Sequence, residues 1–399
     1  MPNRAVILSG SLGSGHDVIC EVVAGSLAGL GWESRTLDSM SMLGRYQGRA
    51  GDWVFRRLMG MPGVYDALHF AHLRPGSRLA EAMDRSATAR LVPALRAELR
   101  REPAELIVAA FATGASAAAK LSGTVPGLRT VALCADAVPH SAWVREGIDL
   151  FLVTSPAAAA WVYRYVPHAA VRVVPPPVRP AFYRPLSQAD ARQAQADARQ
   201  ALGLPVDARC VLLMGGGWGL GPLEEATRAL ADAGVHVLAV AGNNRQLAAR
   251  LAALARNAPR IHAFGFTERI VELMIACDVV VTLPGATTCG EARAVGRRLV
   301  LLDAMPGHGR ENLQHELELG GADACNPRPS DLTASVLAAL DRAADPLPGR
   351  PAGEWDRAFA AALASIGAEP APQPPGPAGD AATTGTGDNR RAPQEASHP

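Results

Sequence analysis

Five glycines within seven residues limit what this chain can fold into more than any other feature. They occupy positions 215, 216, 217, 219 and 221, directly after the apolar, strand-length run Cys210–Met214. Pro222 and the acidic residues after it are typical of the first turn of a helix. Glycines in such a turn let backbone N–H groups come close to an anion, and the helix N-terminus adds partial positive charge. The segment therefore predicts a phosphate cradle, with a ligand-free glycine loop as the alternative.

The spacing of these glycines differs from two common phosphate-binding motifs. No Gly-Lys-Ser/Thr follows them, so the segment is not a Walker loop. They do not form a Gly-x-Gly-x-x-Gly pattern and they stand in the middle of the chain, which argues against a nicotinamide cofactor.

A similar element opens the chain. Residues 5–8 are typical of a short buried strand, residues 9–16 of a Gly/Ser turn that ends in His16, and residues 17–30 of a helix. Two such elements, about 200 residues apart, predict two doubly wound α/β domains that face each other. Ligands of such sheets bind beyond the carboxyl ends of the strands, so both loops would border one cleft. His16 is therefore a candidate functional residue.

The rest of the chain fits this plan. Apolar runs predict strands at 5–8, 105–110, 129–134, 149–154, 171–174, 210–214, 235–240, 260–264, 278–282 and 298–302. Helices are predicted at 77–101, 186–202, 222–233, 244–257, 267–276, 286–296, 310–319 and 354–366. The prolines in 174–180 indicate the start of a hinge. We expect an N-terminal domain at 1–182, a C-terminal domain at 183–345, a last helix within 346–366 and a disordered tail at 367–399.

Composition limits the partners. A net charge of +1 without basic runs argues against nucleic acid. Six isolated cysteines without a Cys-x-x-Cys pair indicate a reducing compartment and predict no metal site. No stretch reaches the ~20 apolar residues of a membrane span. We therefore expect a cytoplasmic protein that does not cross a membrane; its oligomeric state is left open.

Short motifs along residues 5 to 325 stand in an order that resembles a known family. They are Gly10 to His16, Ala135 to Trp143, Pro176 to Phe182, Leu212 to Pro222, Gly265 to Thr267, Cys277-Asp278, Pro284 to Ala292 and Pro306 to Asn312. Together they resemble the monogalactosyldiacylglycerol synthases of glycosyltransferase family 28. That family also includes the N-acetylglucosaminyltransferase of the lipid-linked peptidoglycan precursor, so the resemblance does not name the acceptor.

The resemblance implies a GT-B fold, in which two Rossmann-like domains face each other across a cleft. The C-terminal domain would hold a UDP-sugar and the N-terminal domain the acceptor. Such enzymes invert the anomeric centre without a protein-bound metal, and this chain has no Asp-x-Asp. Backbone amides and a helix dipole can stabilise a diphosphate leaving group without a metal.

Donor-site roles are carried over from the matching motifs. The glycine loop would hold the diphosphate, helped by the helix at 286; Glu291 would bind the ribose hydroxyls, Phe266 and Thr267 the uracil, and His308 and Asn312 the sugar or phosphate. The alternatives are an exposed helical Glu291 and a core Phe266. The donor candidates are Gly215, Gly216, Gly217, Trp218, Gly219, Phe266, Thr267, Pro284, Gly285, Ala286, Thr287, Glu291, Gly307, His308 and Asn312.

Catalytic roles fall on the N-terminal domain. We expect His16 to accept the proton of the acceptor hydroxyl or to orient that hydroxyl, because imidazole is the base best matched to neutral pH. Asp17 and Asp136 are rivals for this role, and His140 would support them. The alternative for Asp136 is a strand-end cap without chemistry.

Residues 43–78 mix aromatic and aliphatic side chains with arginines, which suits a segment that lies in an anionic interface. In the resembled family this region meets the bilayer and the lipid acceptor. The alternative is an amphipathic helix that packs inward. The acceptor and membrane candidates are Gly13, Gly15, Trp53, Phe55, Arg56, Arg57 and Trp143.

The chain departs from the family where the donor sugar is normally read. Trp218 and Leu283 replace a Glu and a Lys, His308-Gly309 replaces Gln-Glu, and Ala135 replaces a Thr. The favoured function is transfer of a hexose from a UDP-sugar to a diacylglycerol-type hydroxyl at the inner face of the cell membrane. The alternatives are a soluble acceptor, a non-catalytic nucleotide-sugar binder and, more distantly, a nucleotide-sugar epimerase.

Overall fold

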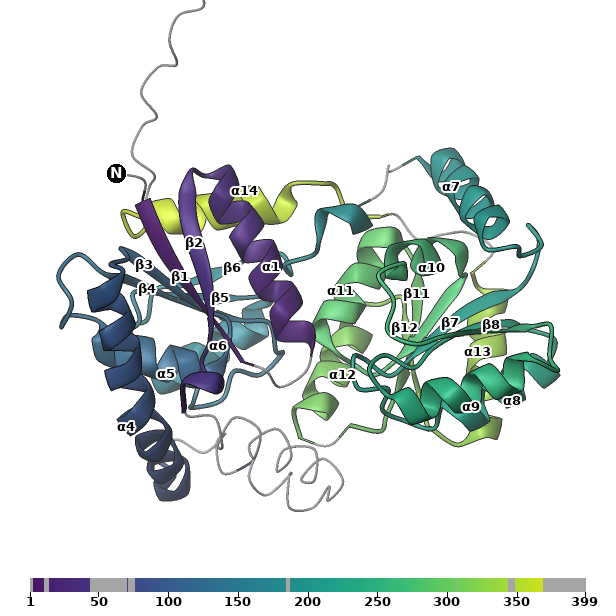
Figure 1. The fold of residues 1–399 in the computed structure, drawn as a ribbon, viewed down its shortest axis with the longest axis horizontal. Helices are drawn as coiled ribbons and strands as arrows, with labels where there is room; N and C mark the ends of the chain where they lie inside the picture. The colour runs from purple at the N-terminus through teal and green to yellow at the C-terminus, as the bar shows by residue number, and fades with distance from the viewer. Residues whose placement is uncertain are drawn as a thin grey trace, which may run out of the picture.

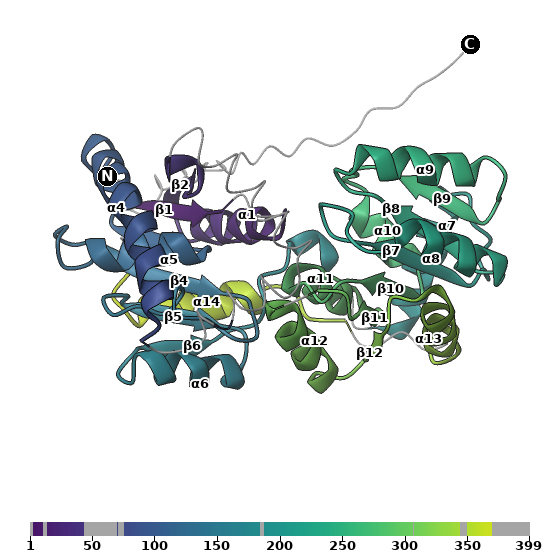
Figure 2. The same ribbon diagram turned by 90° about the horizontal axis from the view of Figure 1, so that it is seen from below.

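Two α/β domains lie side by side in the computed structural model (Figures 1 and 2), each built on a parallel sheet of six strands. The structure describes residues 3–10, 14–43, 70, 76–183, 187–305, 307–343 and 349–368. The predicted class, two doubly wound α/β domains, is confirmed.

The N-terminal sheet has the strand order β2-β1-β3-β4-β5-β6. Its inner strands are buried on both faces and therefore appear in the sequence as continuous apolar runs. Its elements are β1 (Asn3–Ser9), α1 (Ser14–Gly29), β2 (Trp32–Asp38), η1 (Ser41–Leu43), α4 (Arg78–Arg101), β3 (Leu106–Ala109), α5 (Ala112–Leu121), β4 (Arg129–Cys134), β5 (Leu150–Val153), α6 (Pro156–Tyr165), β6 (Val171–Val173) and η2 (Pro180–Phe182).

The C-terminal sheet has the order β12-β11-β10-β7-β8-β9. Its elements are α7 (Gln188–Ala201), β7 (Cys210–Met214), α8 (Leu223–Asp232), β8 (His236–Val240), α9 (Arg245–Ala255), β9 (Ile261–Phe264), α10 (Ile270–Ala276), β10 (Val279–Thr282), α11 (Ala286–Val295), β11 (Arg298–Leu302), α12 (His308–Glu318), β12 (Ala322–Cys325) and α13 (Pro329–Asp341).

The order of the strands reverses once in each sheet, and the glycine loops lie at these reversals. In the N-terminal sheet the chain crosses from β2 past β1 to β3, and in the C-terminal sheet from β9 past β7 to β10. A crevice opens beyond the carboxyl ends of the strands at such a switch point. The loops after β1 and β7 therefore stand where ligands of this architecture bind.

The last helix, α14 (Glu354–Ala364), returns to the N-terminal domain. Trp355 and Phe359 are buried in the same core as Ile7, and the indole N–H of Trp355 donates to Ser26 Oγ over 2.9 Å. The N-terminal domain is thus completed by residues from the far end of the chain, which the linear domain prediction did not anticipate. Packing also continues into the predicted tail as far as Ala368, which is 4% exposed.

Sequence patterns missed β2, β12, α5, α6 and α13. The two strands lie at the edges of their sheets and carry polar residues. Helix α5 is rich in Ala, Gly and Ser and is buried on nearly every side, so it lacks the polar face that marks an amphipathic helix. None of the helices that the structure describes is long and apolar enough to cross a bilayer.

Candidate active site

Two positions of the glycine loop after β7 are fixed by backbone packing. A Cβ on Gly215 would lie 1.9 Å from the carbonyl oxygen of Leu220, and one on Gly219 would lie 2.4 Å from that of Ala241. A Cβ on Gly216, at φ +66, would meet no atom within 4 Å. Packing therefore explains two of the glycines without a ligand, whereas Gly216 borders open space in which its backbone can approach an anion.

The middle of the loop is anchored to the turn after β8. The backbone N–H of Asn243 donates to the Gly217 carbonyl over 2.8 Å, and Trp218 is half-buried beside it. Trp218, which belongs to the loop that we predicted to hold the diphosphate, is thus not fully exposed.

Three helices begin near the line where the domains meet. Helix α1 begins in the loop after β1, α11 follows Pro284 with Gly285 as its N-cap, and α12 follows Gly307. The hydroxyl of Thr287, in the first turn of α11, lies 3.4 Å from the Gly15 carbonyl of α1, and the two helices lie side by side (Figure 1). Helix N-termini carry partial positive charge and free N–H groups, so their convergence favours an anionic ligand.

His16, in the first turn of α1, is held from the N-terminal domain. Its Nδ1 lies 2.9 Å from the Ala110 carbonyl, and its ring meets Phe111 edge-on with centroids 4.9 Å apart. A carbonyl only accepts, so Nδ1 carries the proton and Nε2 keeps its lone pair. Burial lowers the pKa of His16, although the carboxylate of Asp136 works in the opposite direction. A half-buried neutral imidazole with an available lone pair has the properties of a general base.

Gly10 makes this arrangement of His16 possible. A Cβ at Gly10 would lie 2.3 Å from the ring of Phe111, the ring on which His16 rests. The glycine after β1 is therefore required by packing beneath the imidazole.

Asp136 follows β4 and faces histidines from three segments. Burial by itself would raise the pKa of this carboxyl, but His308, His16 and His140, together with a hydrogen bond from Asn312, hold it below the usual value. Asp136 is thus a carboxylate at neutral pH, close to the imidazole of His16. It accepts a hydrogen bond from Asn312 of the other domain, which differs from the simple strand-end cap that we considered.

The other N-terminal candidates lie at different depths. Asp17 is exposed and accepts a hydrogen bond from Ser9 Oγ over 3.1 Å. His140 Nδ1 accepts the Ala142 N–H within its own turn, over 3.3 Å. Trp143, expected to contact the acceptor or the membrane, instead packs in the core of the N-terminal domain and is 3% exposed.

Glu291 does not face an open ribose site in this structure. Its side chain is buried, and its Oε1 lies 2.8 Å from Nη2 and 2.9 Å from Nε of Arg179, in the linker between the domains. Burial raises the pKa of Glu291 to about 7, and Arg179 only partly opposes this effect. The exposed-helix alternative is therefore excluded, and a ribose contact remains a prediction that requires the ion pair to open.

Phe266 and Thr267 stand beyond the carboxyl end of β9, at the edge of the C-terminal sheet. Phe266 is 67% exposed, so the core alternative does not hold and its ring is accessible to a flat ligand. Thr267 Oγ1 accepts the backbone N–H of Arg269 over 3.1 Å.

Asn312, on α12, bridges the domains instead of pointing into open space. It is 5% exposed, its Oδ1 accepts the Ala137 N–H over 2.9 Å, and its Nδ2 lies 3.4 Å from Asp136 Oδ1. His308, four residues earlier on the same helix, is close enough to influence both Asp136 and His16 electrostatically. The C-terminal domain thus supplies two side chains to the surroundings of the catalytic candidates.

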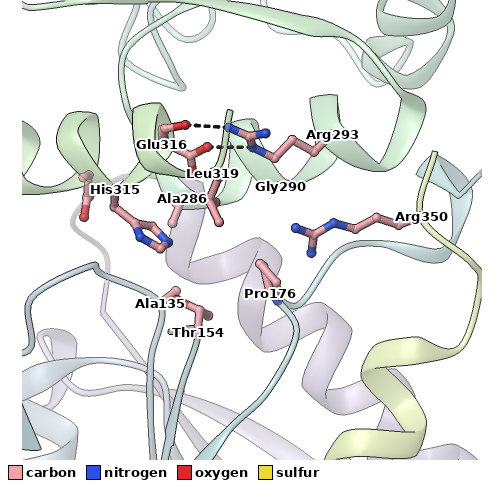
Figure 3. A pocket seen from close by; sticks show the side chains of 11 residues that line it. Ala135, Thr154, Pro176, Ala286, Gly290, Arg293, His315, Glu316, Leu319 and Arg350 are labelled. Carbon is pink, nitrogen blue, oxygen red and sulfur yellow. Dashed lines mark hydrogen bonds and ion pairs between the residues drawn. The ribbon is translucent and has the colours of Figure 1, made fainter. Parts of the chain in front are cut away.

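A cavity of about 50 Å³ lies between α11, α12 and the carboxyl ends of β4 and β5 (Figure 3). Arg293 and Glu316 form an ion pair at 2.8 Å on one wall, and Arg350, in the segment that leads to α14, points toward the centre. The sequence did not single out Arg179 or Arg350, although Arg179 stands inside a quoted motif. The remaining residues that line the cavity are Ala135, Thr154, Pro176, Ala286, Gly290, Asn312, His315 and Leu319.

Several candidates lie outside the described residues, namely Gly13, Trp53, Phe55, Arg56 and Arg57. Next to that segment, Phe70, Leu79 and Met83 are 48%, 51% and 42% exposed. In the part of the chain that is described, no group of three or more His, Cys, Asp or Glu side chains is placed to hold a metal ion.

Comparison with known proteins identifies the second domain. Residues 221–342 match the glycosyltransferase family 28 C-terminal domain. A probable monogalactosyldiacylglycerol synthase from Glycine max is 29% identical over 207 residues, 49% of this chain and 38% of that protein. A processive diacylglycerol beta-glucosyltransferase from Bacillus pumilus is 30% identical over 201 residues, 49% of this chain and 50% of that protein. The chain therefore spans half or less of the length of these relatives.

Solved structures share the whole two-domain architecture at low sequence identity. Acinetobacter baumannii MurG aligns with a TM-score of 0.52 and 16% identity, over 86% of this chain and 92% of its own. A UDP-GlcNAc 2-epimerase from Neisseria meningitidis aligns with a TM-score of 0.58 and 10% identity, over 91% of this chain and 100% of its own. These findings support the resemblance found in the motifs: residues 221–342 match the glycosyltransferase family 28 C-terminal domain, and the chain has a GT-B fold.

Proposed function

We propose that this protein is an inverting glycosyltransferase that moves a hexose from a UDP-sugar to a lipid hydroxyl of the diacylglycerol type. The observation that carries the proposal is that α11 and α12 contact the segments of His16 and Asp136 at the switch points of the two sheets: Thr287 Oγ1 lies 3.4 Å from the carbonyl of Gly15, and Asn312 Nδ2 lies 3.4 Å from Asp136 Oδ1. The similar monogalactosyldiacylglycerol synthase and diacylglycerol glucosyltransferase support the acceptor class.

The acceptor would be activated from the N-terminal side. Nε2 of His16 takes the proton of the acceptor hydroxyl while its oxygen attacks the anomeric carbon on the face opposite the diphosphate. The carbon–oxygen bond to the diphosphate breaks, and UDP leaves with that electron pair. Asp136 stabilises the imidazolium that forms, because its negative charge favours the protonated state of His16.

The leaving group would be stabilised from the C-terminal side. Negative charge develops on the diphosphate, where the N–H groups of α11 and of the loop at Gly216 can donate. We propose that this stabilisation operates without a divalent metal, so chelator should leave turnover unchanged.

The acceptor implies a peripheral association with an anionic membrane surface. Phe70, within residues 43–78, and Leu79 and Met83, just after them, expose apolar area in a part of the chain where arginines are frequent. Apolar side chains flanked by cations suit the headgroup region of a bilayer.

The test is a donor screen on mixed micelles that contain diacylglycerol, with UDP-glucose, UDP-galactose and UDP-N-acetylglucosamine as donors. We expect a glycosylated lipid of inverted anomeric configuration with at least one donor, identified by mass spectrometry and NMR. Calorimetry with UDP runs in parallel. UDP binding without any lipid product would contradict the proposal and favour a soluble acceptor or a non-catalytic binder.

A further inference from the structure

The amide of Asn312 makes both of its hydrogen bonds to successive residues of the other domain. Oδ1 accepts from the backbone N–H of Ala137 at 2.9 Å, and Nδ2 donates to Asp136 Oδ1 at 3.4 Å. Asn312 and Ala137 are 5% and 6% exposed, so water cannot readily replace either partner. A buried N–H that loses its acceptor is costly, which ties the loop after β4 to α12.

The same amide lies beside the carboxylate whose charge matters most for the proposed reaction. The groups that face Asp136 are His16 from α1, His308 and Asn312 from α12 and His140 from its own loop, with Cys134 at the end of β4. Two of these groups, His308 and Asn312, belong to the C-terminal domain. The surroundings of Asp136 are therefore complete only when the two domains are together.

We infer that Asn312 is a positioning residue that couples closure of the two domains to the orientation and ionisation of Asp136. This inference rests on the proposed function only where it concerns turnover; the bridge between the domains stands independently. The inferred role of Asn312 is to hold the loop after β4. From the sequence we had expected Asn312 to contact the donor sugar or the phosphate instead.

Two substitutions separate the two hydrogen bonds. Asn312→Ala removes both. Asn312→Asp keeps an oxygen for the Ala137 N–H but puts a second carboxylate where the amide donated to Asp136. Asn326→Asp is the matched control, because Asn326 is exposed and its Oδ1 also accepts a backbone N–H, that of Arg328 at 3.1 Å.

Hydrogen exchange tests the bridge without any need for activity. In the intact 399-residue chain, we expect exchange in a peptide covering 135–140 to rise at least about tenfold in Asn312→Ala and to stay within about twofold of wild type in the control. Unchanged exchange in Asn312→Ala, with the variant folded by circular dichroism, would overturn the bridge. This readout remains valid if wild type proves to have no transferase activity.

The pH profile tests the effect on the charges around Asp136 and His16. In the proposed mechanism the acidic limb of kcat/KM reports protonation of the base His16, and a second carboxylate beside Asp136 favours the protonated imidazole, so this limb should move up by about one pH unit in Asn312→Asp. KM for the UDP-sugar should change less than kcat, whereas a sugar-binding Asn312 would mainly raise KM. An unshifted acidic limb, or a loss confined to KM, would overturn the positioning role.

Discussion

At the scale of single residues, His16 is the side chain whose removal should matter most. Its Nδ1 is taken by the Ala110 carbonyl, which leaves Nε2 for the acceptor proton. We expect His16→Ala and the bulkier His16→Gln to lower kcat by about 10²-fold or more, because general base catalysis typically contributes that much. UDP affinity measured by calorimetry should hold, since the ring is anchored in the N-terminal domain.

The control for His16 is His168→Ala, which removes an exposed histidine of the same domain. Normal turnover in His16→Gln would transfer the role of base to Asp136 or Asp17. The kcat values of both His16 variants are compared with wild type at equal folded fraction. A lower melting temperature therefore cannot account for a loss of kcat.

A second prediction at the residue scale concerns how Glu291 makes the free energy of unfolding depend on pH. Burial raises its pKa from 4.5 to about 7, so the folded state prefers the protonated carboxyl. A raised folded-state pKa gives stability that is complete below about 4.5 and is lost as the pH rises through about 7. Wild type should therefore lose about 1 to 3 kcal/mol between pH 5 and pH 8 through this group, and Glu291→Gln should lose less.

Urea unfolding at the two pH values measures this difference directly. Equal pH dependence in wild type and Glu291→Gln would mean that Arg179 keeps the carboxylate ionised throughout. Glu316→Gln offers a comparison, since Glu316 is also a buried carboxylate paired with an arginine at 2.8 Å but lies on α12.

At the scale of elements, substitutions in the glycine loop after β7 can distinguish an effect on backbone conformation from an effect on UDP binding. Gly216 and Gly203 have nearly the same φ, +66 and +69, and a Cβ on either would meet no atom within 4 Å. Alanine at either position should cost about 1 kcal/mol through backbone strain. Only Gly216→Ala should also weaken UDP binding, by about tenfold, if the loop cradles the diphosphate.

Calorimetry and urea unfolding of both variants give the two readouts. Equal UDP affinities of Gly216→Ala and Gly203→Ala would mean that the loop does not bind the diphosphate and has a structural role only. Gly219→Ala is not informative here, because its Cβ would lie 2.4 Å from the Ala241 carbonyl and would disturb the fold itself.

Sequence patterns predicted elements best where a strand is buried on both faces. Residues 210–214 and 298–302 appear as β7 and β11 with the same bounds, because such strands leave continuous apolar runs. β2 was missed because it is a half-exposed edge strand in which most of the residues are polar. The pairing of Asn312 with Asp136 could not be predicted, since it depends on how close two separate domains come.

At the scale of the whole molecule, the return of α14 shows what a linear division into domains leaves out. The amphipathic pattern of 354–366 predicts a helix but says nothing about which core receives it. The structure places Trp355 and Phe359 with β1, so the chain crosses between the domains twice. Both crossings contribute cations near the interdomain site, Arg179 from the first and Arg350 from the second.

Membrane association belongs to the same scale, because it depends on which face of the molecule is turned toward the lipid. Leu79 and Met83 lie four residues apart on α4, are 51% and 42% exposed, and adjoin the arginine-rich segment. Burying two such side chains in a bilayer should contribute about 2 kcal/mol in total. The double variant Leu79→Ser/Met83→Ser should therefore bind vesicles of phosphatidylglycerol at least about tenfold more weakly.

Val206→Ser supplies the matched control for this surface, since Val206 is 59% exposed but lies in the C-terminal domain. Cosedimentation at low and high salt separates the two contributions to binding. Salt should weaken wild type and the double variant by the same factor, because the arginines remain, whereas the apolar loss should persist at high salt. Equal binding of the double variant and wild type would place the lipid contact elsewhere on the N-terminal domain, and absence of binding by wild type would favour a soluble acceptor.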